Sequence, residues 1–336
     1  MTALAKKYLT AEVLGKLAQV RAECGFGIED IVRSGVDNPD SSIGAYAGDE
    51  DCYGKFAPLF DPIINDYHGY AADASHHSNF DINSLMNMED MDPSGEVIIS
   101  TRIRVARNIK GFPFPPALST DDRAVIEEKV VAALNNLQGE LSGTYYPLVE
   151  MREETRIQLT EDHFLFKKGD RFLESAGVNG DWPASRGIFH SDDKQFLVWV
   201  NEEDELRIIS MQPGGDLKQV FVRLAQAIAA IESEITFAYN DHLGYLTSCP
   251  TNLGTAMRAS VHVKLPLLGK TQQFQQTCAT LGLSVRGIHG EHSESEGGVY
   301  DISNKQRLGI SEVECIKRLY AGIKDLLAKE RQLGTI

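Results

Sequence analysis

Arginine side chains recur on the segments of this chain that alternate in the manner of β-strands. Within residues 96–107, Arg102 and Arg104 share the polar side of the alternation. Other apolar segments carry further arginines, namely Arg207, Arg258 and Arg286. A guanidinium group is planar and always charged, so several together can bind the oxygens of a polyphosphate bidentately. A single arginine on the outer face of a sheet is usually solvated, and the spacing leaves both interpretations open.

Two carboxylates and one thiol are the other candidates for chemistry. Glu203 lies in a tight turn between two apolar segments, and Glu291 lies in the glycine-rich stretch 287–298. Each of them, taken alone, has the usual setting of a solvated turn carboxylate. Cys249 is followed by proline in a loop before a strand, where a thiol could be exposed. A free cysteine is also often buried as a small apolar side chain, so its role stays open at this point.

The elements that must position these residues are a sheet and several helices. Residues 195–200 and 205–211 are β-rich and joined by a short polar turn, which predicts a hairpin. Residues 258–265 alternate again. In residues 96–107 the alternation puts Ile99, Thr101, Ile103 and Val105 on one face, opposite the arginines. Helical spacing of apolar residues follows four capping side chains, which are Thr10, Ser119, Asp216 and Ser311.

The pattern changes along the chain in a way that predicts two domains. Residues 1–75 have helical spacing and little strand signal, and residues 76–95 are polar and are predicted to be a linker. Residues 96–336 mix strands that follow one another closely with helices. We therefore expect an α+β fold, with a small all-α N-terminal domain and a larger domain whose mainly antiparallel sheet is flanked by helices.

Composition excludes several classes of function. The 336 residues include 33 basic and 48 acidic side chains, a net charge of -15, which argues against binding to nucleic acid or to an anionic membrane. The five cysteines include no Cys-x-x-Cys pair, which favours a reducing compartment over a disulfide scaffold. No apolar run is long enough to span a bilayer or to form a signal peptide at the N-terminus. A cytoplasmic location is predicted.

The common nucleotide and metal motifs do not fit. Residues 269–271 read Gly-Lys-Thr, but Lys264 stands where a phosphate-binding loop needs its first glycine. No His-Arg-Asp or Asp-Phe-Gly motif of the usual protein kinases occurs. His289, Glu291 and His292 lack the helical His-Glu-x-x-His frame of a zinc hydrolase, so a metal-dependent hydrolase is disfavoured.

Several longer blocks are identified as similar to one family, the phosphagen (ATP:guanido) kinases. The resemblance covers nearly the whole chain and is carried by residues 100–104, 198–204, 249–255 and 258–262. Within the family, residues 41–46 and 290–300 are most similar to the arginine-specific members. The resemblance implies the catalytic fold of this family, which is like that of glutamine synthetase.

The resemblance also implies roles for individual residues. Catalysis would fall to Glu203, Glu291 and Cys249, with the carboxylates clamping the guanidinium and the thiolate stabilising it electrostatically. The nucleotide would be bound by Ser100, Thr101, Arg102, Ile103, Arg104, His163, Arg207, Arg258, Ala259, Ser260, Val261, His262, Arg286, Gly287, Ile288, His289, Gly290 and Glu291. The guanidino substrate would contact Ser41, Ser42, Ile43, Gly44, Tyr46, Glu203, Cys249 and Glu291.

The implied activity is reversible transfer of the γ-phosphoryl group of ATP to the guanidino nitrogen of L-arginine, an energy-buffering reaction. Mg²⁺ would be held by ATP phosphates and water and not by a protein site. The implied partners are ATP or ADP and a small guanidino substrate, with the chain a monomer or homodimer. Ser42 and Ala45 depart from the arginine-specific pattern, which keeps taurocyamine or lombricine as alternative substrates. A protein-arginine kinase, whose family lacks the helical domain, and a catalytically silent nucleotide-binding protein are further alternatives.

Overall fold

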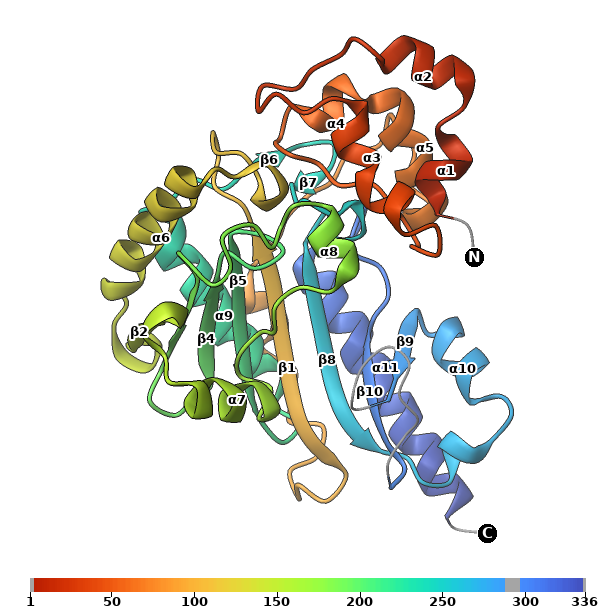
Figure 1. Ribbon diagram of the computed structural model, residues 1–336. Coiled ribbons are helices and arrows are strands. Elements are labelled where there is room, and N and C mark those ends of the chain that lie inside the picture. Colours follow the sequence, from red (N-terminus) through yellow and green to blue (C-terminus); the bar gives the residue numbers. More distant parts are fainter. Residues whose placement is uncertain (1–2, 288–296, 335–336) are drawn as a thin grey trace.

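A helical unit caps one end of a broad sheet in the computed structural model, which describes residues 3–287 and 297–334 (Figure 1). Buried side chains such as Ile31, Phe56 and Phe60 form the core of this N-terminal unit. The Thr10 hydroxyl accepts the Val13 N–H and caps the second helix, as predicted. The unit contains α1 (Leu4–Tyr8), α2 (Ala11–Leu17), α3 (Ile28–Asp37), α4 (Cys52–Lys55) and α5 (Ala57–His68).

Among the described residues, eight strands form the main sheet in the order β2-β3-β4-β5-β1-β8-β10-β9. Every neighbouring pair is antiparallel, which confirms the predicted α+β class. The strands are β1 (Ile98–Arg107), β2 (Thr144–Pro147), β3 (Gly187–His190), β4 (Phe196–Val200), β5 (Leu206–Pro213), β8 (Met257–Lys264), β9 (Leu283–Arg286) and β10 (Val299–Asn304). A small separate sheet pairs β6 (Tyr239–Asn240) with β7 (Gly244–Tyr245).

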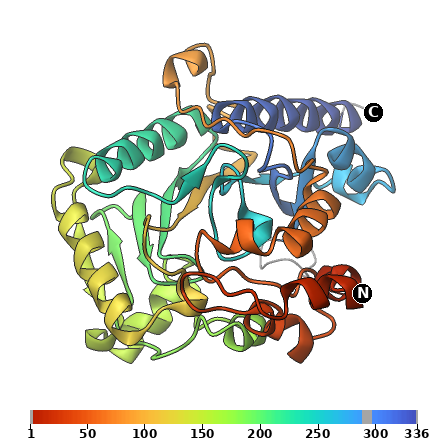
Figure 2. The ribbon, with the colours of Figure 1, turned by 90° about the horizontal axis from the view of Figure 1, so that it is seen from above.

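One face of the main sheet is apolar, and the other carries polar side chains along β1 and β8 and a smaller apolar cluster over β3, β4 and β5. Ile103 and Val105 of β1 are fully buried and pair with apolar residues of β8. This face packs against α9 (Leu217–Glu232) and α11 (Glu312–Leu333), which Figure 2 shows side by side along the sheet in teal and blue. Because side chains alternate between faces, the polar residues of β1 must point away from these helices.

The predicted alternation of β1 is wrong at its first position. Ile99 was expected on the buried face, yet it is 43% exposed while Ile98 is 1% exposed. Ile98 pairs with Val263 and Ser100 pairs with His262, so β1 has one extra residue, Ile99, between two consecutive residues of β8. This bulge turns Ile98 inward and Ile99 outward.

Capping side chains begin the longer helices where the sequence predicts. The side chains of Ser119, Asp216 and Ser311 accept the backbone N–H of the third residue after each of them. The remaining helices are α6 (Thr120–Asn135), α7 (Glu153–Glu161), α8 (Arg171–Ser175) and α10 (Phe274–Thr280). Of the helices in the described ranges, none combines the length and apolar character needed to cross a bilayer.

The segment predicted as a linker, residues 76–95, packs against the helices behind the sheet. Leu85 is buried, and the Phe80 ring stacks on Phe221 of α9 with ring centroids 5.8 Å apart. The Glu312 carboxylate of α11 accepts the Asn79 N–H at 2.7 Å. These contacts attach the segment to the larger, sheet-containing unit.

The Glu312 contact predicts a stability effect. Replacing Glu312 with Ala removes the charged acceptor of the Asn79 N–H and of the Ser78 hydroxyl, so we expect the free energy of unfolding to fall by about 1–3 kcal/mol. Urea denaturation measures this loss. Glu314→Ala is the control, because Glu314 lies on the exposed side of α11, where its carboxylate pairs with Arg318. Equal effects of the two substitutions would contradict an anchoring role for Glu312.

Candidate active site

The arginines that the sequence predicts on strands lie on the polar face of the sheet. Arg104 of β1 pairs directly with Arg258 of β8, and Arg207 of β5 pairs with Ala106 of β1. On the far side of β8, Asp301 of β10 pairs with both His262 and Arg286. Directly paired residues of antiparallel strands point to the same side of a sheet. The register therefore puts all the predicted arginines, Arg102, Arg104, Arg207, Arg258 and Arg286, on one face.

Their proximity makes this arginine face strongly cationic. Burial and the neighbouring Arg207 and Arg258 lower the pKa of Arg102 to about 10. Burial and the charges of the same neighbours also lower the pKa of Arg104 far below its ordinary value. Both shifts mean that the protein alone disfavours the charged guanidinium at these positions. A bound polyanion would relieve this cost.

Acidic side chains compensate part of the charge. Arg207 is held by Glu202 at 2.8 Å and by Glu203 at 3.1 Å. Asp301 pairs with Arg258 at 2.8 Å, and its Oδ2 lies 3.8 Å from Nε2 of His262. Burial acts to raise the pKa of Asp301, but hydrogen bonding to His262 and the charge of Arg258 lower it to about 2. Asp301 is thus a fixed anion beside the arginines.

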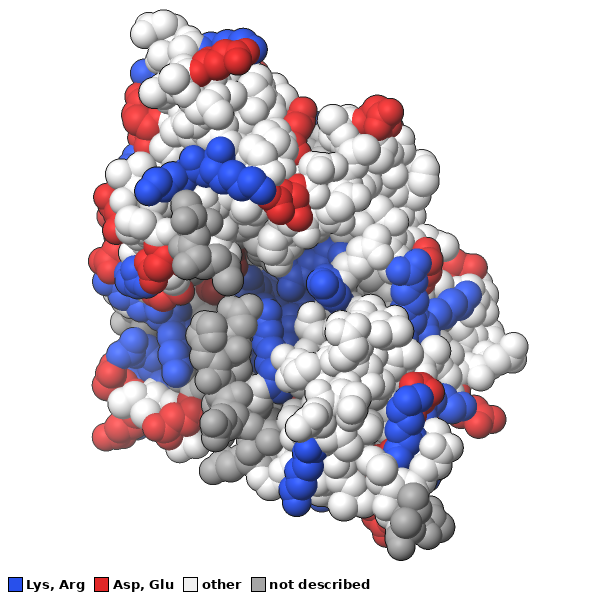
Figure 3. Space-filling model, turned by 90° about the vertical axis from the view of Figure 1, so that its right-hand side faces the viewer, with Lys and Arg blue, Asp and Glu red and all other residues white. Residues whose placement is uncertain are grey.

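Two adjoining hollows open over the arginine face. One, of about 670 Å³, is lined by Arg258 and Arg286, and the other, of about 310 Å³, is lined by Arg102 and Arg104. They meet where Arg104 pairs with Arg258. Figure 3 shows basic side chains gathered in the hollow below the N-terminal unit. Together the hollows have the size of a small-molecule ligand site.

The other predicted nucleotide residues divide into three groups. Ser100, Ser260 and His262 share the face of the arginines, and the exposed His163 lies near them, its carbonyl oxygen accepting from Arg102 at 3.4 Å. The side chains of Thr101, Ile103, Ala259 and Val261 are buried on the opposite, apolar face, so only their backbone groups remain for a ligand. Gly287 follows β9, whereas Ile288, His289, Gly290 and Glu291 lie outside the described residues.

Glu203, Cys249 and Tyr46 converge beside the arginine face. The Ser248 hydroxyl donates to the Glu203 carbonyl oxygen at 3.0 Å, which ties the hairpin turn to the loop of Cys249. Cys249 and Tyr46 lie in one small apolar cluster with Val178. Burial raises the pKa of Glu203 to about 7, although the Arg207 charge opposes the shift. Glu203 therefore lies beside the thiol of Cys249, and a bound cation would favour the ionised form of its carboxylate.

Cys249 is buried, with 7% of its surface exposed, so the exposed setting considered from the sequence is not found. Its Sγ lies 3.2 Å from the Thr251 hydroxyl. Burial, and then the charge of Glu203, raise the pKa of this thiol to about 12, even though Thr251 acts to lower it. The protein without substrate therefore favours the neutral thiol, and the thiolate implied by the resemblance needs the charge of a bound cation.

Residues 41–46 form a tightly held loop of the N-terminal unit. The carbonyl oxygens of Ser42 and Ile43 accept from α1, and Ser41 donates its N–H to Asn38. Gly44 has a φ of +75°, and a Cβ there would lie 2.7 Å from Cα of Gly35, so this close approach of two backbones requires glycine. The loop ends at Tyr46, which joins the cluster around Cys249, while Ser42 is exposed.

Comparison with known proteins agrees with this geometry. Residues 2–65 match the ATP:guanido phosphotransferase N-terminal domain, and residues 125–333 match the C-terminal catalytic domain. The chain belongs to the ATP:guanido phosphotransferase family. An arginine kinase of Penaeus vannamei is 50% identical over 331 residues, which cover 98% of this chain and 93% of that protein. An arginine kinase of Anthopleura japonica is 53% identical over 332 residues, but this chain spans only 46% of its length.

Solved structures of the family have the same architecture. The crystal structure of a lombricine kinase superposes with a TM-score of 0.95 at 38% identity, covering 99% of this chain and 93% of that one. The duplicated taurocyamine kinase of Schistosoma mansoni, with bound transition-state-analogue components, superposes with a TM-score of 0.92 at 44% identity. The match covers 98% of this chain and 46% of that one.

Some residues of this candidate site were missed from the sequence. Trp199 of β4 lies between two arginines, with its ring centroid 5.5 Å from Cζ of Arg102 and 5.7 Å from Cζ of Arg207. Arg307 lines the larger hollow and donates to the Thr251 carbonyl oxygen at 3.2 Å. The alternation of β10 could have indicated Asp301, but no local pattern distinguishes Arg307.

The crowding of the arginine face predicts a trade-off between stability and ligand binding. We expect Arg104→Met to raise the melting temperature of the ligand-free protein by roughly 1–3 °C, because one repelling charge is removed. The same variant should lose most of the increase that tripolyphosphate produces in the parent. Differential scanning calorimetry measures both effects. Arg33→Met, on α3 where Arg33 pairs with Asp30, should change neither. A lower melting temperature for ligand-free Arg104→Met would contradict the repulsion.

Proposed function

We propose that this chain transfers the γ-phosphoryl group of ATP reversibly to the guanidino nitrogen of L-arginine. The observation that carries the proposal is the arginine face of the sheet adjoining Glu203 and Cys249. A polyphosphate and a guanidinium group have opposite charges, and binding of each would favour the charged form of the side chains that it meets, the arginines and Glu203. The similarity to arginine kinases over nearly the whole chain supports arginine as the acceptor.

The phosphate end of the reaction depends on positioning and charge. In-line phosphoryl transfer needs the charge on the transferred group to be neutralised. It also needs the leaving oxygen of ADP and the attacking guanidino nitrogen to be aligned on opposite sides of the phosphorus. Arg102, Arg104, Arg207, Arg258 and Arg286 would supply the positive charge. The carboxylates described on this face pair with arginines, so the residues fit a Mg²⁺ ion that arrives on ATP and keeps phosphate and water ligands. Bound Mg²⁺ would neutralise phosphate charge.

The guanidinium end depends on Glu203. Its carboxylate would accept two parallel hydrogen bonds from the substrate, and the bound cation would return Glu203 to its charged form. The pKa of a guanidinium exceeds about 12, so alignment and not early proton removal is the role we assign to Glu203. Cys249 would stabilise the same cation as a thiolate, and Tyr46 would close the pocket on the N-terminal side. Glu291 is the second carboxylate of the proposed clamp.

Taurocyamine or lombricine kinase activity is the second candidate. Relatives named for both substrates share the fold, and the exposed Ser42 lies in the loop proposed to contact the acceptor. Those acceptors share the guanidino group with arginine but differ at the other end. The arginine face and Glu203 would serve all of them, so residues that contact the other end of the acceptor, such as residues 41–46, would separate the candidates.

We also propose that residues 1–75 and 96–336 are the two domains and that residues 76–95 join them. The separate matches to an N-terminal and a catalytic domain support this division. A cytoplasmic location is proposed as well, supported by the free thiols of all five cysteines.

A substrate panel tests the proposed reaction. ADP formation from MgATP is measured with arginine, taurocyamine, lombricine, creatine and glycocyamine, and arginine should give the highest kcat/KM. We expect Glu203→Gln to lower kcat with arginine by at least about 100-fold, because the charge that orients the acceptor is lost, while the Kd for ADP stays within about twofold. Glu154→Gln, at an exposed position of α7, should be unaffected. An unchanged kcat in Glu203→Gln would refute the clamp, and preference for taurocyamine or lombricine would select the second candidate.

The raised pKa of Glu203 predicts a pH effect on substrate binding. The pKa of Glu203 in the empty site is about 7, so below this pH its carboxyl is mostly protonated and a binding guanidinium must displace the proton. At about pH 6 we expect arginine to bind more weakly than at about pH 8 and to release close to one proton. Titration calorimetry in two buffers of different ionisation enthalpy counts the released proton. Glu203→Gln should release none, and proton release equal to that of the parent would assign the titration to another group.

A further inference from the structure

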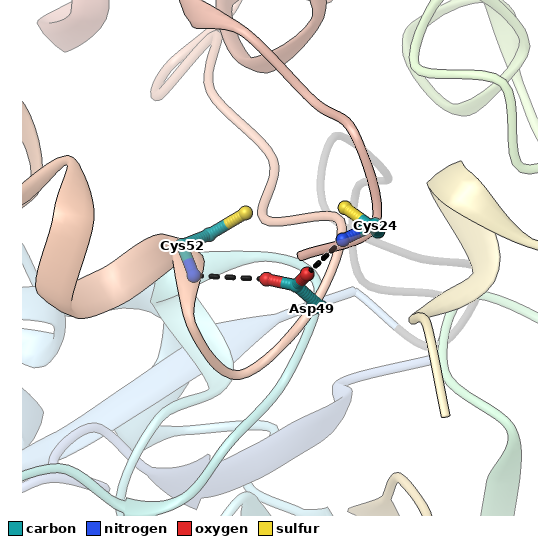
Figure 4. Close-up of side chains that lie close together, drawn as sticks. All are labelled: Cys24, Asp49 and Cys52. Atoms are coloured by element: carbon teal, nitrogen blue, oxygen red, sulfur yellow. Dashed lines mark hydrogen bonds between the residues drawn. The ribbon is translucent and has the colours of Figure 1, made fainter. Parts of the chain in front are cut away.

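A second cluster of reactive side chains lies in the N-terminal unit, away from the arginine face. Cys24 lies in the turn after α2, Cys52 is the first residue of α4, and Asp49 lies in the loop before it. The two Sγ atoms and a carboxylate oxygen all lie within 4.8 Å of one another. Figure 4 shows the thiol groups pointing toward each other, with the Asp49 carboxylate beside them. The reaction proposed above uses none of these side chains.

Hydrogen bonds from the backbone hold the three side chains in place. The Cys24 N–H donates to Oδ2 of Asp49 at 2.6 Å, and the Cys52 N–H donates to Oδ1 at 2.9 Å. The Gly48 N–H donates to Sγ of Cys52 at 3.3 Å. Hydrogen bonds of this kind orient the carboxylates of metal sites while leaving lone pairs for the ion.

The cluster is enclosed but reachable. Cys52 and Asp49 are 0% and 6% exposed, and Cys24 is half-buried, so Cys24 lies on the open side. A Cβ at Gly48 would lie 2.6 Å from the Phe26 ring and 2.9 Å from Sγ of Cys24. Glycine at this position is therefore what lets the loop lie directly against the thiol and the aromatic ring.

The charge of the cluster favours a cation. In the described part of the chain, Asp49 forms no ion pair with a lysine or arginine, and its hydrogen bonds come from neutral backbone groups. Nearby basic side chains are paired elsewhere, Lys55 with Asp51 and Arg21 with Glu29. A buried carboxylate without a cationic partner is costly unless a positive ion compensates it.

We propose that Cys24, Asp49 and Cys52 bind one thiophilic divalent cation of the Zn²⁺ type. Tetrahedral Zn²⁺ with bonds of about 2.3 Å to sulfur and about 2.1 Å to oxygen separates its ligand atoms by roughly 3.5–3.8 Å. The present spread needs only small side-chain movements to reach these values. Binding releases the two thiol protons to solvent and leaves the fourth ligand position to water.

The bound ion would join the turn of Cys24 to a loop that leads to the proposed acceptor pocket. The Ala47 N–H, two residues before Asp49, donates to the Ser248 carbonyl oxygen at 2.8 Å, next to Cys249. The ion would therefore stiffen the loop that connects the N-terminal unit to the site. This consequence rests on the proposed function, whereas binding of the metal does not.

Cobalt titration tests the site without reference to activity. The full chain is reduced, freed of reductant under anaerobic conditions and titrated with Co²⁺. One equivalent should produce thiolate-to-cobalt charge-transfer absorption with the visible bands of tetrahedral Co²⁺, and Zn²⁺ should abolish both. Cys24→Ser and Cys52→Ser should lose the charge-transfer band or bind at least tenfold more weakly, and Asp49→Asn should bind about tenfold more weakly. Cys249→Ser and Cys278→Ser are matched thiol controls and should titrate like the parent.

The outcomes separate the alternatives. Circular dichroism checks that each variant is folded, so that a lost band reports the ligand and not the fold. Absence of the band in the folded parent, or its survival at full strength in both Cys24→Ser and Cys52→Ser, would overturn the proposal. Kinase activity is assayed separately, so failure of the proposed reaction would leave the cobalt result intact.

Discussion

The repulsion among arginines on one face of the sheet is the constraint on which the rest of the structure depends. Arg104 and Arg258 are paired across adjacent strands, and burial as well as the charges of neighbouring arginines lowers the pKa of Arg104. The strands can hold them there because their other face is packed against α9 and α11 in a continuous apolar core. Glu202, Glu203 and Asp301 balance part of the charge, and the remainder is available to a polyanion. Packing of the apolar core therefore stabilises the sheet enough to keep these mutually repelling arginines on one face.

Local pattern predicts the fold more fully than it predicts the site. Alternation places Arg102 and Arg104 on one side of β1, and the caps at Ser119 and Asp216 fix where helices begin. Convergence of the arginines, by contrast, is set by pairing between strands that are far apart in the chain. The bulge that turns Ile99 outward shows the same limit, because it depends on the register with β8 and not on the sequence of β1.

The site divides in the same way. The turn that presents Glu203 could be predicted, since its hairpin is short and its strands are apolar. The burial of Cys249 could not, because it is produced by Tyr46 and Val178 from distant segments. Roles for these residues came from family resemblance, and Arg307 had neither a pattern nor an assigned role. Packing between segments decides which polar side chains are functional, and one segment alone does not contain that information.

The parts of the proposed site differ in whether they can distinguish one acceptor from another. In the proposed reaction the arginine face would recognise only phosphate, which every acceptor reaction of the family has in common, so it would place no limit on the acceptor. The guanidinium group is likewise common to all the proposed acceptors, and Glu203 would recognise only that group. We therefore propose that residues 41–46, held in the N-terminal unit by the close approach of Gly44 and Gly35, contribute to the choice of acceptor. Substitutions in this short loop of the N-terminal unit would then alter the preferred acceptor, while the sheet and its arginines stay the same.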